Sequence, residues 1–338
     1  MNMSISTLVK TLAVVTLLGV GSAAHAVTLK IATQAPDGTT WMKDMRAAGK
    51  EIAEKTDGRV KIKYYPGGVM GNYKSVMKKI RIGQLHGGAV TGDSLANLYP
   101  DMGTYGLPML FNNYAEADYV RSRLDPSLIK GIQDKGFTML GITEGGFAYL
   151  MSNGPVRSIA DLKTHKLWIP EGDALNEALF RKMGVNPISL PLSDVYTGLQ
   201  TGLIDTIGST TAGALAFQWH TRIKSVTEVP LLYIVGVLIV EKKRFDRIKP
   251  ADQEIVKTVI TRVFKDMNQK NRIDNDKAKQ ALKKLGIEFV RPDAQEETRW
   301  KQIAHEVIME TGQASNSSQM YMKVENLLKE FQAQQAKK

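Results

Sequence analysis

The chain has 338 residues, a formal net charge of +11 and no cysteine. Without cysteine it can form neither disulfides nor thiolate sites. Its basic residues are interleaved with acidic ones, as in Lys265-Asp266 and Asp276-Lys277. The positive charge therefore indicates a solvated surface rather than nucleic-acid binding, which favours basic blocks with interleaved aromatic residues.

The first 26 residues have the pattern of a secretory signal peptide. Lys10 precedes an apolar stretch, residues 11–20, and small residues then lead to Ala24-His25-Ala26, an A-x-A cleavage site. An apolar stretch of about 10 residues is shorter than the roughly 20 that span a bilayer. We therefore expect residues 1–26 to direct export, and the periplasmic chain to begin at Val27.

The residues that follow predict alternating strands and helices. Residues 28–33 and 60–64 alternate apolar and polar side chains, as strands do. A helix between them places Trp41, Met45, Ala48 and Ile52 on one face and ends before Gly58. A second helix follows Pro66-Gly67-Gly68. Strand-helix alternation with short loops predicts an α/β domain with a mostly parallel sheet.

A second α/β unit begins near Phe137. Strands are expected at 137–142, 147–151, 166–169 and 204–207, and helices at 174–183 and from an N-cap at Ser193 to Thr201. Gly202 is placed to end the second of these helices. The apolar stretch 229–240 contains Pro230 and Gly236, and predicts a buried strand rather than a membrane span.

The last third of the sequence is helical in pattern. Pro250 stands at a helix start, and an apolar stripe runs from Ile255 to Met267 and on to Leu285 before Gly286. Further helices carry Trp300 and Val307, and then residues 321–331. The polar tail, residues 331–338, is expected to be frayed.

Motifs for catalysis or metal binding are not found in the sequence. It has no H-E-x-x-H, G-x-S-x-G, P-loop or G-x-G-x-x-G pattern, and its five histidines lie far apart. No metal site is predicted, and an enzyme is the less favoured interpretation.

Several motifs, in a fixed order along the chain, resemble the DctP-type solute receptors of tripartite ATP-independent periplasmic (TRAP) transporters. They lie at 54–60 with 66–71, at 99–100 with 106–111, at 159–168, and at 183–187, 190–196 and 199–205. Each motif alone is weak, whereas the ordered set covers nearly all of the chain after residue 26.

The resemblance implies a two-lobed α/β fold of the periplasmic-binding-protein type (type II-like), with hinge strands and long C-terminal helices. Mapped onto this chain, lobe one comprises residues 27–145 and 236–274, and lobe two residues 146–235 and 275–330. Such lobes close by a hinge motion around a small molecule that contacts both of them. The resemblance further implies delivery of the solute to the small and large TRAP membrane subunits, with no cofactor.

Three positions depart from the family pattern. Typical members bind a substrate carboxylate with an Arg in a K-[IL]-R-[VI] strand, whereas this chain has Trp168 there. A second family Arg corresponds to Ala148, and a family Asn corresponds to Ser209. A guanidinium grips both oxygens of a carboxylate, so the usual clamp for an acid is expected to be missing. The ligand is therefore expected to be uncharged, aromatic or apolar-tailed.

Two alternatives accompany this interpretation of Trp168. A nearby Arg, either Arg157 or Arg181, could replace the missing one. Trp168 could also belong to the core, although strand alternation places it on the opposite face from Leu167 and Ile169, where it would line the cleft. Its indole would then offer a ligand an apolar face and one N–H donor.

Other candidate ligand-binding residues lie near strand ends and in the crossing segment, where α/β sheets usually bind ligands. Glu171 and Asp173 precede a helix, and Asp173 is equally well explained as its N-cap. The remaining candidates in lobe two and the crossing segment are Phe147, Tyr149, Ser209 and Thr210, and those in lobe one are Asp37, Trp41, Thr91 and Asp93.

Other classes of protein share the two-lobed architecture. An ABC-type receptor, a sensory binding protein and a periplasmic enzyme remain alternatives, as does a conventional C4-dicarboxylate receptor.

Overall fold

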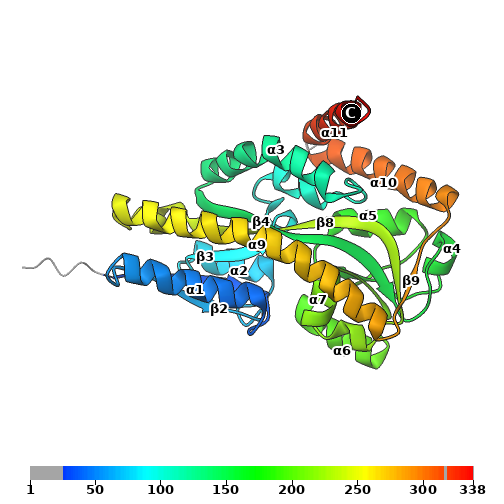
Figure 1. Cartoon of the computed structure of the whole chain (residues 1–338), viewed down its shortest axis with the longest axis horizontal. Coiled ribbons are helices and arrows are strands. Elements are labelled where there is room, and N and C mark those ends of the chain that lie inside the picture. The colour runs from blue at the N-terminus through cyan, green and yellow to red at the C-terminus, as the bar shows by residue number, and fades with distance from the viewer. Residues whose placement is uncertain (1–25, 316–317, 338) are drawn as a thin grey trace, which may run out of the picture.

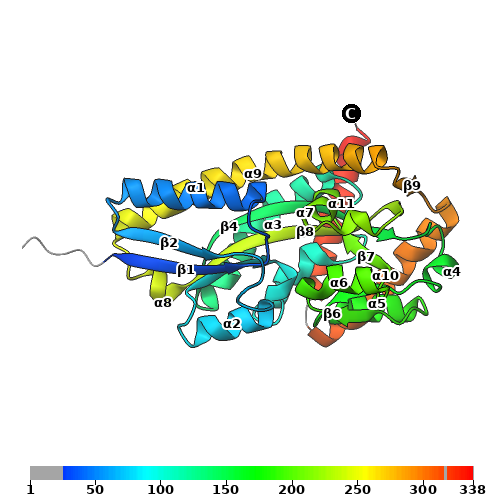
Figure 2. The same cartoon turned by 90° about the horizontal axis from the view of Figure 1, so that it is seen from below.

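The computed structural model describes residues 26–315 and 318–337, so all of the predicted signal peptide except Ala26 lies outside the described residues. The molecule is elongated, and a single long helix, α9 (Pro250–Lys284), runs along most of its length (Figures 1 and 2). In the described part of the chain, no helix has the length and apolar character needed to cross a membrane.

The N-terminal part forms the predicted alternation of strands and helices. It comprises β1 (Val27–Thr33), α1 (Thr40–Lys55), β2 (Val60–Tyr65), α2 (Tyr73–Arg81) and β3 (Gly87–Thr91). The three strands are parallel, in the order β2-β1-β3. Thr39 caps α1 by accepting a hydrogen bond from the Met42 N–H, and the helix buries Met42, Met45, Ala48 and Ile52. Trp41 is only half-buried, at the edge of this face.

Two long antiparallel strands, β4 (Phe137–Ser152) and β8 (Ser225–Glu241), extend the sheet and cross from one end of the molecule to the other (Figure 1). The sheet order is β2-β1-β3-β8-β4-β7, and β9 pairs with β8. The separate strands predicted at 137–142 and 147–151 are one strand, interrupted by register shifts near Gly141 and Gly146. Bulges at these glycines bend the strand without ending it.

The second α/β unit contains several short elements. They are α4 (Ile159–Leu162), β5 (Trp168–Pro170), α5 (Ala174–Lys182), β6 (Ile188–Leu190), α6 (Val195–Thr201), β7 (Thr206–Ser209) and α7 (Thr211–Ala216). β5 and β6 form a separate two-stranded sheet. The predicted N-cap at Ser193 is wrong, because a 3-10 turn (Leu192–Asp194) precedes α6 and Ser193 bonds to the Asp194 carboxylate. Gly202 ends α6 in the left-handed conformation, as predicted.

The C-terminal helices follow α8 (Lys242–Phe245) and begin with α9, which has Pro250 in its first turn as predicted. After α9 come β9 (Glu288–Val290), α10 (Ala294–Ser315) and α11 (Ser318–Gln335). The predicted frayed tail from residue 331 is helical as far as Gln335, because Phe331 packs against Tyr119 with ring centroids 5.2 Å apart.

Helix α3 (Tyr114–Asp134) was not predicted, although it supplies much of the core beside the sheet. α11 packs against α3, and Tyr321 and Val324 share a buried cluster with Val120 and Leu124. Residues assigned to lobe two thus pack on a helix of lobe one. The remaining core residues form one cluster under α1 and α9 and two clusters in the second unit.

Candidate functional site

A cavity of about 160 Å³ lies at the carboxyl ends of β1 and β3, beside the crossing strands. Side chains from both N-terminal helices and from α9 contribute to its wall. Its lining is mostly apolar and aromatic, with a few amide and hydroxyl groups: Thr33, Gln34, Ala35, Trp41, Tyr73, Ala89, Val90, Thr91, Thr143, Gly236, Val237 and Phe264. The carboxyl edge of parallel strands is where α/β sheets bind ligands, so this cavity is a candidate solute site.

Two predicted residues of lobe one, Trp41 and Thr91, line the cavity. Asp93 begins the 3-10 turn after β3 and is exposed. Asp37 lies in the exposed loop before α1, where its carboxylate is paired with Arg46 at 2.9 Å. The Arg46 guanidinium holds the pKa of Asp37 below its usual value. Asp37 is therefore committed to a surface ion pair.

A hydrogen bond joins the two lobes close to this cavity. Asn72 caps α2 and also donates from its side-chain nitrogen to Glu171 Oε2 at 2.6 Å. Glu171 directly follows β5 in lobe two and is exposed. Tyr73 directly follows Asn72 and lines the cavity, so the contact between Asn72 and Glu171 lies beside the cavity.

Asp173 is the N-cap of α5, as the alternative interpretation expected. Its carboxylate accepts from the Asn176 backbone N–H at 3.1 Å and from the Asn176 amide at 2.7 Å. Burial raises the pKa of Asp173 to about 6 although the Asn176 bonds act against this, and the Asp93 carboxylate of lobe one raises it further. The Asp93 carboxylate thus acts on Asp173 across the predicted boundary between the lobes.

Trp168 is buried, with only 5% of its surface exposed. Its indole N–H donates to the Leu190 carbonyl at 3.0 Å, and its ring meets Trp219 edge to face at 5.7 Å. Phe217 stacks on the other side of Trp219. The expectation that the indole N–H is free for a ligand is therefore wrong, because a neighbouring strand carbonyl accepts it.

The crossing-strand candidates are also enclosed. Phe147 packs between Tyr114 and Tyr233, with ring centroids 4.9 and 5.2 Å away, and belongs to the core beside α3. Ala148 is 1% exposed. Tyr149 is partly buried and stands opposite Ser209 in the β4–β7 register. Phe147 therefore packs in the core, whereas Tyr149 lies beside the end of β7.

The turn between β7 and α7 uses its hydroxyl groups internally. Ser209 is buried and donates to the Thr210 carbonyl at 3.0 Å. Thr210 caps α7 by accepting from the Gly213 N–H at 3.0 Å. These residues shape the turn, and the structure does not assign them a ligand contact.

Neither Arg proposed as a replacement for the missing clamp is free. Arg157 pairs with Glu288 at 2.8 Å, and Arg181 pairs with Glu177 at 2.9 Å on the surface of α5. Both side chains are about half exposed. Their charges are satisfied at sites other than the cavity, whose lining includes neither residue.

The structure identifies site residues that the sequence interpretation missed. Gln34, Tyr73 and Phe264 line the cavity, and Asn72 bridges the lobes. Gln34 follows the last residue of β1, a position that a rule based on strand ends could have found. Phe264 lies 14 residues inside α9, and only the packing of that helix on the sheet brings it here. In the described ranges, no group of three or more acidic or histidine side chains is arranged to hold a metal ion.

Comparison with known proteins identifies the family. The profile of "Bacterial extracellular solute-binding protein, family 7" (DctP) matches residues 31–314. The 2,3-diketo-L-gulonate-binding periplasmic protein YiaO of Escherichia coli is 26% identical over 71% of this chain and 73% of its own length. The C4-dicarboxylate-binding periplasmic protein DctP of Rhodobacter capsulatus is 27% identical over 75% and 77%, respectively.

A solved structure has the same fold. The TRAP periplasmic solute-binding protein of Desulfovibrio salexigens, with bound orotic acid, superposes with a TM-score of 0.81 at 18% identity. The match covers 91% of this chain and 99% of that one. The two-lobed α/β fold with long C-terminal helices is therefore confirmed. The chain belongs to the DctP family of extracellular solute-binding proteins, which bind small molecules and are not enzymes.

Proposed function

We propose that this member of the DctP family is the periplasmic receptor of a TRAP transporter. In this proposal residues 1–26 direct export, and the two lobes close on a small solute. The closed receptor then delivers the solute to the small and large membrane subunits. The names of the relatives support the compartment and the transporter class.

The hydrogen bond between Asn72 and Glu171 is the observation that carries this proposal. It joins a helix N-cap of lobe one to the loop after β5 in lobe two, beside the cavity. Only strands β4 and β8 and helix α9 run on from one lobe to the other before the C-terminal helices (Figure 2). Proteins that close by a hinge typically have a few continuous segments that absorb the rotation. Side chains of the two lobes then meet on the opposite sides of the space between them.

We further propose that the solute is uncharged, aromatic or apolar-tailed. Trp168, Ala148 and Ser209 leave the positions of the family clamp without a guanidinium. Instead, Glu171, Asp173 and Asp93 bring negative charge to the boundary between the lobes. A carboxylate enclosed there would lose its hydration without an equivalent partner, at a cost of several kcal/mol.

The aromatic surface for such a solute lies in lobe one. Trp41, Tyr73 and Phe264 line the cavity, whereas Trp168 is enclosed among its neighbours. A flat or apolar group placed against these rings would gain about 25 cal/mol for each Å² removed from water. Gln34 and Thr91 would supply polar contacts at the same place.

A conventional organic-acid receptor is the second candidate. The relatives named above bind 2,3-diketo-L-gulonate, C4-dicarboxylate or orotic acid, according to their names. Orotic acid combines a flat ring with a carboxylate, so a solute of that kind would satisfy part of each proposal.

Native mass spectrometry of the protein freshly purified from the periplasm would identify a retained solute. A thermal-shift screen should then show little response to succinate, malate and fumarate, and a clear response to flat or hydrophobic solutes. Tight binding of a simple dicarboxylate would overturn the ligand proposal and leave the receptor proposal standing.

Transport assays separate the remaining alternatives. Proteoliposomes that contain the two TRAP membrane subunits should take up the solute only when this protein is added, without ATP. Uptake that requires an ATPase would favour an ABC-type receptor. Binding to a sensor kinase without uptake would favour a sensory role.

A further inference from the structure

Asn275 lies on α9 at the point where β4 and α9 both pass from lobe one to lobe two. Its side-chain nitrogen donates to the Gly145 carbonyl at 2.9 Å. Its side-chain oxygen accepts from the Ala212 N–H at 3.1 Å and from the Thr211 hydroxyl at 3.2 Å. Asn275 is 8% exposed, so water competes little for these bonds. One amide group thus connects the crossing strand to the first turn of α7.

The stretch of β4 that Asn275 contacts is irregular. The register with β8 pairs Glu144 with Val235 and Gly146 with Ile234, so Gly145 has no partner in the ladder. The Gly145 carbonyl is partly buried and has no partner in the ladder, and Asn275 supplies a donor for it. A β-bulge of this kind is a natural place for a strand to bend.

Other polar side chains on the same face of α9 hold the same stretch of β4. Asn268 Oδ1 accepts from the Thr143 hydroxyl and the Glu144 N–H, at 3.0 and 2.9 Å. Asn271 donates to the Glu144 carbonyl, and Arg272 donates to the fully buried Glu144 carboxylate. Among the residues that the structure describes, Asn268 and Asn271 form side-chain hydrogen bonds only to β4, whereas Asn275 reaches both β4 and α7.

Gly146 shows how closely Asn275 is fitted to the bulge. Gly146 has φ of +104°, a conformation that L side chains rarely adopt. A Cβ added there would lie 2.5 Å from the Asn275 side-chain nitrogen. Gly146 therefore leaves room for the Asn275 amide, and the Tyr114 hydroxyl lies close to the same point.

The turn on the other side of Asn275 contains two predicted ligand-contact residues. Ser209 and Thr210 directly precede Thr211, whose hydroxyl also donates to the Asn275 backbone carbonyl at 2.7 Å. Closure of lobe two around a solute would displace this turn, and Thr211 and Ala212 would transmit the displacement to Asn275. The same side chain would pass it to the bulge at Gly145.

We propose that Asn275 is a positioning residue that couples the β7–α7 turn to the bend of β4, so that movement of lobe two on solute binding is linked to that bend and shifts the equilibrium between open and closed lobes. This inference rests on the proposed receptor function. A coupling of this kind corresponds to about a fivefold or greater change in the ratio of the two states.

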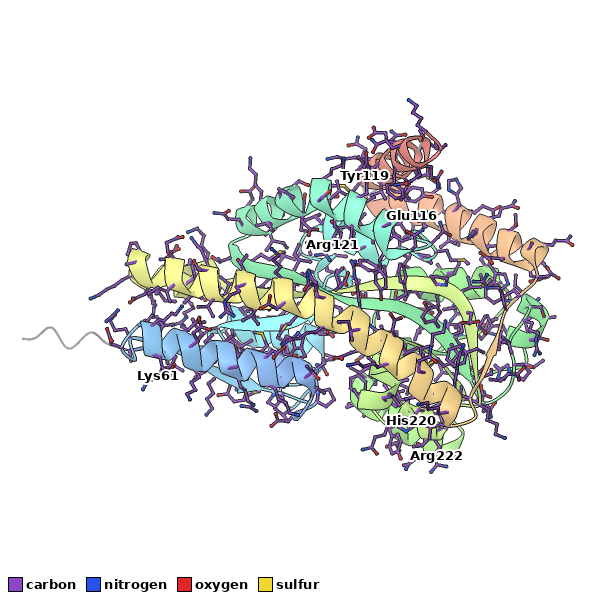
Figure 3. All side chains as sticks on the ribbon, in the orientation of Figure 1. Lys61, Glu116, Tyr119, Arg121, His220 and Arg222 are labelled. Carbon is purple, nitrogen blue, oxygen red and sulfur yellow. The ribbon has the colours of Figure 1, made fainter. Side chains whose placement is uncertain are left out.

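The test measures the distance between two spin labels in the whole protein by pulsed electron paramagnetic resonance. The chain has no cysteine, so Lys61→Cys and Arg222→Cys can be labelled specifically. Both residues are exposed, and Figure 3 labels their places. Lys61 belongs to predicted lobe one and Arg222 to predicted lobe two. Protein as purified is compared with protein that was unfolded in guanidinium and refolded to remove any retained solute.

Two variants break the coupling from opposite sides. Asn275→Asp loses the donor to Gly145 and keeps the acceptor for α7, whereas Thr211→Val loses the hydroxyl on the α7 side. Asn268→Asp is the matched control, because Asn268 acts only as an acceptor toward β4 and its replacement keeps that capacity. We expect each coupling variant to lower the ratio of short to long distances about fivefold, and the control to leave it unchanged.

Thermal unfolding of each variant distinguishes coupling from general damage. If Asn275→Asp does not fold, Thr211→Val still tests the proposal. Equal ratios in both coupling variants and the unaltered protein would overturn the inference, as would an equal change in the control. One fixed distance in the unaltered protein, with and without retained solute, would instead overturn the hinge on which the proposed function depends.

Discussion

The two sides of the candidate site differ in whether their side chains are available to a solute or already bonded to other parts of the protein. On the lobe-one side, Trp41, Tyr73 and Thr91 border a cavity at the ends of parallel strands. On the lobe-two side, Trp168 and Ser209 are buried and bonded to their own neighbours. Trp168 and Ser209, which the sequence predicts at two positions of the family's acid clamp, are therefore engaged within the protein itself.

The sequence predicts that Trp168 replaces a ligand-binding Arg of the family, and such a replacement would change the place of recognition as well as its chemistry. A guanidinium needs a partner and remains beside the ligand, whereas an indole gains most by packing. Trp168 has Trp219 as an aromatic neighbour and Leu190 as an acceptor, and so requires no solute. Solute contacts are then expected to come mainly from lobe one.

Trp168→Ala tests the lobe-two side and should have the largest effect. Removing a buried indole from the cluster leaves a cavity, and we expect a loss of about 3–5 kcal/mol in the free energy of unfolding. Urea unfolding followed by circular dichroism measures it. Trp168→Phe is the control that keeps most of the volume and should cost less. An unchanged stability in the alanine variant would show that Trp168 faces the solute.

Trp41→Ala tests the lobe-one side. Trp41 is half-buried on the cavity wall, so its loss should change the stability little. Binding of the solute that gives the largest thermal shift should weaken by roughly 1–3 kcal/mol. Isothermal titration calorimetry measures the change, with Trp300→Phe, a change in the core of lobe two, as the control. Full affinity in Trp41→Ala would contradict the assignment of the cavity.

Asp173→Asn tests the charge at the boundary between the lobes. The pKa of Asp173 is raised to about 6 by burial, with Asp93 adding to the effect, so its ionised form is disfavoured in the folded state. Its favourable contribution is complete below the unfolded pKa near 3.8 and is lost as the pH rises through 6. Because Asp173 is only partly buried, we expect a loss of about 1–2 kcal/mol between pH 4 and 7.

Asparagine is also a good N-cap, so the substitution should keep the cap and remove the charge. Stability measured from pH 4 to pH 7 should therefore decline less in Asp173→Asn than in the unaltered protein. Asp161→Asn, which removes a partly exposed carboxylate in α4, serves as the control for the loss of one negative charge. A parallel pH profile for Asp173→Asn would contradict the raised pKa.

Glu171→Gln tests the cross-lobe contact and should have the smallest effect. The bond from Asn72 is short but exposed, and its charged acceptor becomes a neutral one. We expect the free energy of closure to become less favourable by about 0.5 kcal/mol, which lowers the ratio of closed to open molecules roughly twofold. Spin-label distances between the lobes measure that fraction, and Glu177→Gln on α5 is the control. A twofold or larger gain of the closed form would show that the contact opposes closure.

The regular elements were predicted well where local pattern decides them. The strand at β1, helix α1 and the start of α9 at Pro250 agree with the sequence, because alternation, capping and proline act over a few residues. The prediction of an N-cap at Ser193 was wrong, since a 3-10 turn satisfies the same backbone groups. The candidate site was predicted in part: Trp41 and Thr91 lie on the cavity. Phe264 could not be found, because its place depends on how α9 packs.

The sequence by itself determined the family and the α/β alternation, and it predicts that Trp168 replaces the usual Arg, since these inferences depend on residue identity and order. Only the tertiary structure decided which of those side chains remain available to a solute. Trp168 and Phe147 could equally have faced a cleft or a core, and long-range packing with Trp219 and Tyr233 settled their burial. The reason is physical: periodicity selects the face of a strand, whereas distant segments of the chain determine what covers that face.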